Sequence, residues 1–150
     1  MTAPGDSLDR LLAESEIRNL VARLAHLADD GDLEAYLALW TPDAVWSRDT
    51  GEICRGTAAL RERVLAYRAA GLQGPGTGST HINTTLLVEV TGPDTATARS
   101  TFLFLAGGAH PLSPDPQALK SQPVMVGRYD DRFVRTSAGW RISSRTIIAV

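Results

Sequence analysis

Apolar side chains in the first part of the chain recur every three or four residues, which is the spacing of one face of an α-helix. The stripe runs over residues 8–28 and predicts one long helix, with a break near residues 14–15. Residues 1–6 precede the stripe and are expected to form a loose tail. The acidic run 29–32 ends the helix, because carboxylates are unfavourable near the negative end of a helix dipole.

Short segments follow the long helix. Asp32 is suited to cap a second helix over residues 33–39, because its short side chain can accept a hydrogen bond from a backbone N–H of the first turn. Residues 44–48 alternate in polarity as a strand does, and residues 52–55 are expected to pair with them in a hairpin. A third helix is predicted over residues 58–70.

The second half of the chain is rich in β-branched residues, which predicts long strands joined by turns. Helices followed by consecutive strands indicate an α+β fold, in which N-terminal helices cover the concave side of a curved antiparallel sheet. A glycine-rich loop is expected at 71–78 and a long proline-rich excursion at 107–123, of a length often found in lids. The predicted strands are residues 79–90, 95–106, 124–136 and 140–150.

The strand at 79–90 carries the most suggestive polar side chain of the chain, His81. Side chains alternate between the two faces of a strand, so His81, Asn83 and Leu87 are expected to share one face. A histidine and an asparagine on one face of an otherwise apolar strand suggest the wall of a pocket.

The composition narrows the choice of partners. The chain has 150 residues, 43% hydrophobic and 21% charged, with a net charge of -2, which is typical of one globular domain. It has no basic stretch, so we expect no nucleic-acid partner. Neither a membrane span nor a signal peptide is evident, so we expect a cytoplasmic protein with no membrane partner. The single Cys54 excludes an internal disulfide.

Seven short stretches occur in an order that is typical of one known family. They are Ile17-Arg18-Asn19-Leu20 with Ala28-Asp29-Asp30-Gly31-Asp32, Leu39-Trp40-Thr41-Pro42-Asp43-Ala44-Val45-Trp46, Gly51-Glu52-Ile53-Cys54-Arg55-Gly56, Thr80-His81-Ile82-Asn83, Gly127-Arg128-Tyr129-Asp130-Asp131 and Gly139-Trp140-Arg141-Ile142. Over residues 8–148 the chain resembles the SnoaL-like family of the nuclear-transport-factor-2-like (NTF2-like) superfamily. The resemblance implies a single domain shaped as a conical α+β barrel, with a pocket between sheet and helices. It also implies a homodimer or higher homo-oligomer built on the outer face of the sheet.

The resemblance further implies a catalytic pair. In scytalone-dehydratase-like and bile-acid-dehydratase-like members, a carboxylate at the end of the first long helix orients a histidine on the strand after the glycine loop. Asp29 and His81 match these positions. Other members are polyketide cyclases, ketosteroid isomerases, epoxide hydrolases or non-catalytic modules, so the fold alone does not choose the reaction.

The chemistry of such a pair is general acid–base catalysis. Histidine is the common side chain whose ordinary pKa, about 6.5, lies nearest neutrality. A carboxylate on one ring nitrogen leaves the other nitrogen free to take a proton from a carbon next to a carbonyl. His81 is therefore the candidate base and Asp29 its orienting carboxylate. Alternatively, His81 could satisfy a buried backbone group, and Asp29 could belong to a solvated acidic turn with Asp30 and Asp32.

Further residues are candidates for binding a substrate. Asn83 could hydrogen-bond a substrate oxygen, and Tyr129 could donate to a developing enolate. Some relatives carry a second histidine on the neighbouring strand, where this chain has phenylalanines, and His110 could replace it only if its loop folds over the pocket. Each candidate could equally belong to the core or the surface. The remaining candidates are Trp40, Trp46, Phe102, Phe104 and His26.

No metal or cofactor is expected, because the three histidines lack metal-ligand spacing and no glycine-rich phosphate motif occurs. We therefore expect a cofactor-independent lyase or isomerase that binds a hydrophobic, oxygenated ring substrate such as a polyketide or steroid. Dehydration, double-bond migration and aldol-type cyclisation all begin with removal of a proton activated by a carbonyl. The alternatives are a non-catalytic binding or assembly module, and an auxiliary β-subunit of a ring-hydroxylating oxygenase.

Overall fold

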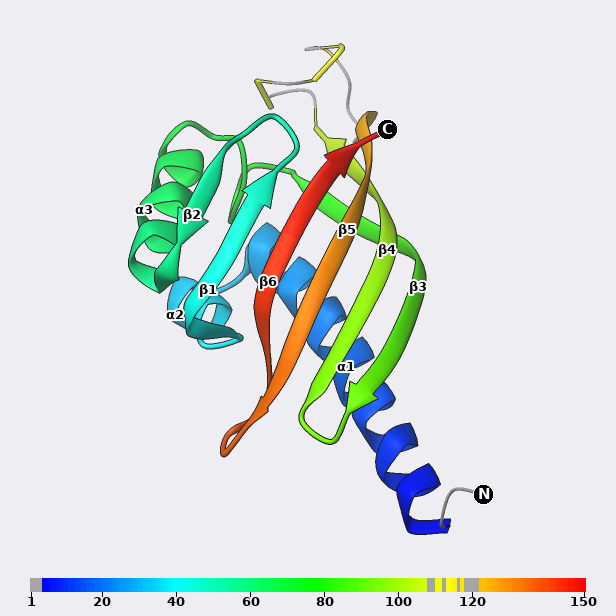
Figure 1. Ribbon diagram of the computed structural model, residues 1–150. Coiled ribbons are helices and arrows are strands. Elements are labelled where there is room, and N and C mark those ends of the chain that lie inside the picture. Colours follow the sequence, from blue (N-terminus) through cyan, green and yellow to red (C-terminus); the bar gives the residue numbers. More distant parts are fainter. Residues whose placement is uncertain (1–3, 108–109, 112, 116, 118–121) are drawn as a thin grey trace.

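The computed structural model describes residues 4–107, 110–111, 113–115, 117 and 122–150. The described helices and strands build one curved sheet with helices on its concave side, which confirms the α+β class (Figure 1). None of these helices is long and apolar enough to cross a membrane. The elements are α1 (Pro4–Asp30), α2 (Leu33–Leu37), β1 (Trp40–Arg48), β2 (Ile53–Arg55), α3 (Gly56–Ala69), β3 (Thr80–Gly92), β4 (Thr95–Ala106), β5 (Gln122–Thr136) and β6 (Gly139–Ala149).

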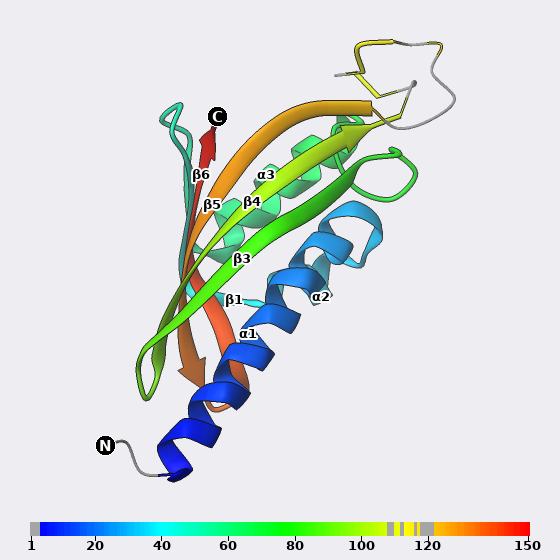
Figure 2. The same ribbon diagram turned by 90° about the vertical axis from the view of Figure 1, so that its right-hand side faces the viewer.

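The sheet has the strand order β2-β1-β6-β5-β4-β3. The four long strands β3 to β6 are antiparallel neighbours, as predicted, whereas β1 runs parallel to β6 and makes the sheet mixed. The sheet curves strongly but does not close into the expected barrel, because β2 and β3 remain at its two edges (Figure 2). Helices cover the opening instead, with α1 packed on β3 and α3 packed on β1.

Helix α1 is continuous over its whole length, so the predicted break near residues 14–15 is wrong. Ala13 and Ile17 are buried on either side of that point, and Arg10 pairs with Glu14 across it at 3.3 Å. The helix also begins at Pro4 rather than after residue 6, since a proline in the first turn lacks only an N–H that would have no intrahelical partner. Residues 1–3 of the predicted tail lie outside the described residues.

The second helix ends at Leu37 rather than at residue 39, because the chain already joins the sheet at Trp40. Asp32 caps it as expected, with Oδ1 accepting from the Ala35 N–H at 2.8 Å. The Leu39 carbonyl then accepts from the Ile142 N–H of β6 at 2.9 Å, which draws the following residues into β1. Pro42 therefore lies within β1, in the stretch where its register with β6 shifts, which is where a strand tolerates proline.

A β-bulge in β3 decides which side chains face the helices. The register with β4 shifts between Asn83 and Leu86, so one extra residue is inserted there. The shift turns Leu87 to the outer face, where it is 60% exposed, and the prediction that it shares the face of His81 is wrong. Arg18 of α1 donates to the Leu86 carbonyl at 2.9 Å and ties the bulge to the helix.

Candidate functional site

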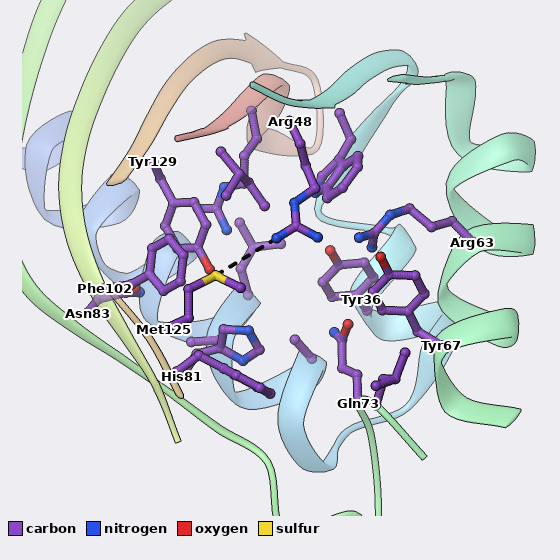
Figure 3. A pocket seen from close by; sticks show the side chains of 18 residues that line it. Tyr36, Arg48, Arg63, Tyr67, Gln73, His81, Asn83, Phe102, Met125 and Tyr129 are labelled. Carbon is purple, nitrogen blue, oxygen red and sulfur yellow. Dashed lines mark hydrogen bonds between the residues drawn. The ribbon is translucent and has the colours of Figure 1, made fainter. Parts of the chain in front are cut away.

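A cavity of about 310 Å³ lies between the concave face of the sheet and the three helices (Figure 3). Its lining combines aliphatic and aromatic side chains with polar and charged ones, and pockets of this volume bind small molecules. Every helix contributes to it, and so does every strand except β2. The lining residues are Leu24, Ala25, Ala28, Tyr36, Trp46, Arg48, Arg63, Tyr67, Leu72, Gln73, His81, Asn83, Phe102, Phe104, Met125, Tyr129, Arg145 and Ile147.

Asp29 and His81 meet at the wall of this cavity. The Asp29 carboxylate accepts the His81 backbone N–H on Oδ2 at 2.7 Å and contacts ring Nδ1 through Oδ1 at 2.5 Å. The two side chains are 17% (His81) and 13% (Asp29) exposed. Because Asp29 engages Nδ1, Nε2 is the ring nitrogen left for a molecule in the cavity. The two residues that the sequence paired are thus in direct contact.

The end of α1 is built to hold Asp29 in this position. A carboxylate near a helix C-terminus is unfavourable, and the two hydrogen-bonding groups of His81 compensate for that cost. Arg68 of α3 donates to the Gly31 carbonyl at 2.8 Å, which places a cation at the negative end of the helix. A side chain at Gly31 would bring its Cβ within 2.4 Å of the Leu27 Cα, so glycine lets the chain turn directly after the helix.

Aromatic rings form the sheet side of the cavity. The Phe104 ring lies 4.8 Å from the His81 ring, and Phe102 stacks on Tyr129 with centroids 4.2 Å apart and an interplanar angle of 9°. The Phe102 ring occupies the space beside Gly127, where an added Cβ would lie 2.4 Å from it. Burial raises the pKa of Tyr129, so its phenol stays a neutral donor.

A second acid–base pair lies deeper on the same face. Arg145 makes a two-pronged contact with Asp131, Nε to Oδ1 at 2.8 Å and Nη2 to Oδ2 at 2.7 Å. Burial would lower the pKa of Arg145, but the charge and hydrogen bonds of Asp131 outweigh burial and raise it. The guanidinium also lies over the Tyr129 ring, 3.9 Å from its centroid. Arg145 is therefore permanently charged and holds Tyr129 in place.

Two further arginines line the cavity, and the sequence reasoning missed both. Arg63 of α3 lies 3.5 Å from the Trp46 ring centroid and 4.0 Å from that of Tyr67, and its Nε donates to Glu52 at 2.9 Å. Arg48 of β1 reaches toward Met125, with Nη2 3.8 Å from Sδ. The alternation predicted for residues 44–48 already placed Arg48 on the face of Trp46, which was the available signal.

The other sequence candidates divide into those that line the cavity and those that do not. Asn83 lines it, and its buried Oδ1 has no hydrogen-bond partner among the described residues. Trp46, Phe102, Phe104 and Tyr129 line it too. Trp40 does not line it, but begins β1 in the core, with its ring centroid 6.0 Å from that of Tyr36.

Neither of the other two histidines belongs to the lining. His26 is exposed: the cavity-facing positions of α1 are 24, 25 and 28, and position 26 is rotated by about 160° from both 24 and 28. His110 is buried beside the cavity, with Nε2 2.8 Å from the Leu72 carbonyl and its ring edge-on to Phe104 at 5.5 Å. Among the described residues no group of three or more His, Cys, Asp and Glu could hold a metal ion.

Comparisons with known proteins support the same architecture. The family model of the SnoaL-like domain matches residues 9–146. A search of curated proteins finds no match. Among solved structures, the chain resembles an NTF2-like protein with a cystatin-like fold from Novosphingobium aromaticivorans, at 29% identity and a TM-score of 0.79, over 97% of this chain and 87% of that chain.

Two further neighbours carry names that refer to dehydration. One is a candidate scytalone dehydratase from Novosphingobium aromaticivorans, at 17% identity and a TM-score of 0.73, over 96% of this chain and 88% of that one. The other is a candidate dehydratase of the NTF2-like family from Streptomyces avermitilis, at 21% identity and a TM-score of 0.75, over 94% and 98%. At these identities the likeness shows the fold alone.

Proposed function

This chain belongs to the SnoaL-like domain family, and we propose that it is a cofactor-independent lyase or isomerase acting on a hydrophobic, oxygenated ring substrate. The observation that carries the proposal is the Asp29–His81 pair at the wall of the cavity. Asp29 engages both the backbone N–H and ring Nδ1 of His81, at 2.7 and 2.5 Å. This arrangement orients the imidazole and stabilises the imidazolium that forms when Nε2 takes a proton.

In the proposed reaction, Nε2 of His81 removes a proton from a carbon next to a substrate carbonyl. The electron pair moves onto the carbonyl oxygen and gives an enolate. In a dehydration, the enolate re-forms the carbonyl and expels a β-hydroxyl group, which takes the proton from the imidazolium and leaves as water. In an isomerisation, the same proton returns to a different carbon of the conjugated system. Neither route needs a redox partner.

Other lining residues suit the enolate and the ring. Burial raises the pKa of Tyr129, so its phenol can donate a hydrogen bond to a developing oxyanion without losing its proton. Asn83 adds an amide to the same wall. The rings of Phe102 and Phe104 offer flat apolar surface to a planar substrate. Two structural neighbours are named as candidate dehydratases, so dehydration is the reaction that we test first.

The experiment is a screen of hydroxylated cyclic ketones, such as β-hydroxy tetralones, in D2O. Appearance of the naphthol, to which the enone formed by loss of water tautomerises, and deuterium incorporation at the α-carbon are measured together. We expect turnover in the wild type, and a loss of about 100- to 10,000-fold in kcat/KM in His81→Gln, because a general base contributes that much. Asp29→Asn should lose activity too, since it no longer stabilises the imidazolium.

His26→Gln is the matched control, because it removes an exposed histidine from the helix that carries Asp29. It should keep wild-type activity. Exchange that survives in His81→Gln would contradict the assignment of the base. If the wild type binds these ketones and neither dehydrates nor exchanges any of them, a non-catalytic binding module becomes the better account of the cavity.

A further inference from the structure

Arg48 is a cation in the cavity wall without an acidic partner. Every Asp and Glu of the chain lies in the described part of the structure, and none of them forms a salt bridge with Arg48. The contact recorded for its guanidinium is Nη2 to the Met125 sulfur at 3.8 Å, which is a weak acceptor. A half-buried guanidinium therefore faces the cavity with donors to spare.

The other basic side chains that line the cavity each have a carboxylate partner. Arg145 is paired with Asp131, Arg63 with Glu52, and His81 with Asp29. A charged group removed from water without a partner is costly, so proteins pair such groups or use them to bind ligands. The contrast singles out Arg48 as the cation whose counterion must come from outside the chain.

We infer that the substrate of this site carries a carboxylate, and that Arg48 binds it. This inference rests on the proposed function for the location of the reacting carbon beside His81. A planar guanidinium suits a planar carboxylate, because two parallel N–H···O bonds can form at once. One arginine fork matches one carboxylate. A phosphate would leave oxygens without donors in a wall whose other arginines are already paired.

The position of Arg48 makes it an anchor rather than a partner of the reacting oxygen. Arg48 is on β1 and His81 is on β3, and three strands lie between them in the sheet. Figure 3 shows Arg48 entering the cavity from the side opposite His81, with its guanidinium directed toward Met125. A ring held between Arg48 and His81 would direct its carboxylate to Arg48 and its acidic carbon to Nε2. Arg48 thus determines substrate class and orientation.

The test compares 2-naphthoate with methyl 2-naphthoate, two probes that share a ring system and differ in charge, by isothermal titration calorimetry on the full chain. We expect wild type to bind the acid about 10- to 100-fold more tightly than the ester. Arg48→Gln should remove this preference. Arg48→Lys, which keeps the charge but loses the fork, should keep part of it. Both variants should keep the wild-type circular dichroism spectrum.

Arg99→Gln is the matched control, because it removes one positive charge from a side chain on the outer face that is 64% exposed. It should keep the wild-type preference, which separates a local contact from a change in net charge. The inference is overturned if wild type binds the ester as tightly as the acid or binds neither probe. A preference for the acid that survives in Arg48→Gln overturns it as well.

Further variants separate this inference from the proposed reaction. His81→Gln should abolish α-carbon exchange and still prefer 2-naphthoate over its ester. Failure of the proposed reaction would therefore not by itself contradict carboxylate binding by Arg48. Once a ketone substrate is found, its carboxylated form should show a KM raised about 10- to 100-fold by Arg48→Gln with kcat nearly unchanged. A fall in kcat for acid and ester alike would make Arg48 a partner of the enolate and would overturn its role as an anchor.

Discussion

Two acid–base pairs lie at the concave face of the same sheet. They differ in how exposed they are and in whether all their hydrogen-bonding groups have partners within the protein. Asp131 and Arg145 are 1% and 9% exposed, and they satisfy one another through two parallel hydrogen bonds. Asp29 and His81 are 13% and 17% exposed, and Asp29 engages one of the two ring nitrogens. The first pair is complete within the protein, whereas the second keeps a nitrogen for a ligand.

The difference separates a framework from a reactive group. Guanidinium is permanently charged, so the Asp131–Arg145 pair cannot exchange a proton with a substrate near neutral pH. Its effect is to fix neighbouring groups, among them the Tyr129 ring 3.9 Å from the guanidinium carbon. Imidazole can gain and lose a proton in that range, which suits His81 to chemistry. Burial and a complete set of partners thus indicate structure, and an incomplete set indicates function.

The largest expected effect comes from removing one charge of the buried Asp131–Arg145 pair. Asp131→Asn leaves the buried Arg145 charge without its counterion and should lower the free energy of unfolding by about 3–5 kcal/mol. Asp29→Asn should change it by about 1 kcal/mol, because the amide oxygen can still accept one of the two His81 hydrogen bonds. Urea denaturation followed by circular dichroism measures both values.

Asp130→Asn is the control for Asp131→Asn, because this neighbouring carboxylate is 34% exposed on the outer side of the same strand, with Arg99 and Arg128 as partners. It should cost less than about 1 kcal/mol. Replacing both members of the buried pair, as Asp131→Leu with Arg145→Met, should recover much of the stability. Equal losses for Asp131→Asn and Asp29→Asn would remove the distinction between the two pairs.

The sequence predicted one pair and missed the other for a physical reason. The matched motifs around Asp29 and His81, and the helix and strand boundaries next to them, were enough to propose their contact. Asp131 and Arg145 face one another because β5 and β6 pair at this register. The sequence gives no local sign of which residues of two strands will be opposite one another. The same holds for the parallel pairing of β1 with β6 and for the bulge after Asn83.

A smaller effect is expected in the aromatic layer that separates the two pairs. In Gly127→Ala the new methyl group would lie 2.4 Å from the Phe102 ring and push it away from Tyr129. Overpacking of this kind costs about 1–3 kcal/mol, measurable as a lower urea midpoint. The double variant Gly127→Ala with Phe102→Leu should regain stability, because the smaller side chain vacates the space. If the single variant is as stable as wild type, the layer is looser than its geometry indicates.

The local sequence pattern also did not predict which residues face the cavity when a side chain's polarity differs from what its location would suggest. Arg48 shares the cavity face of β1 with Trp46, as strand alternation requires, yet a charged residue in a short strand is normally assigned to solvent. Conversely, His26 was a candidate for the pocket or for the helix surface, and it lies on the exposed side of α1. The direction in which each element faces depends on the whole sheet, which local periodicity does not contain.

The smallest effect is expected at alkaline pH, and it tests whether the tyrosines of the concave face are more shielded from water than the Asp29–His81 pair. Burial raises the pKa of both Tyr36 and Tyr129. An unfolded tyrosine ionises near pH 10, so above that pH the unfolded state binds fewer protons than the folded state, and stability falls as the pH rises. The contribution is fully present below pH 10 and declines by about 1.4 kcal/mol per pH unit for each tyrosine.

Tyr129→Phe should remove the part of this decline in the free energy of unfolding that Tyr129 causes between pH 10 and 11, as measured by urea denaturation. His26→Gln should leave the decline unchanged. A slope that Tyr129→Phe does not change would mean that its phenol ionises in the folded protein, and that this wall is as open to water as the Asp29–His81 pair.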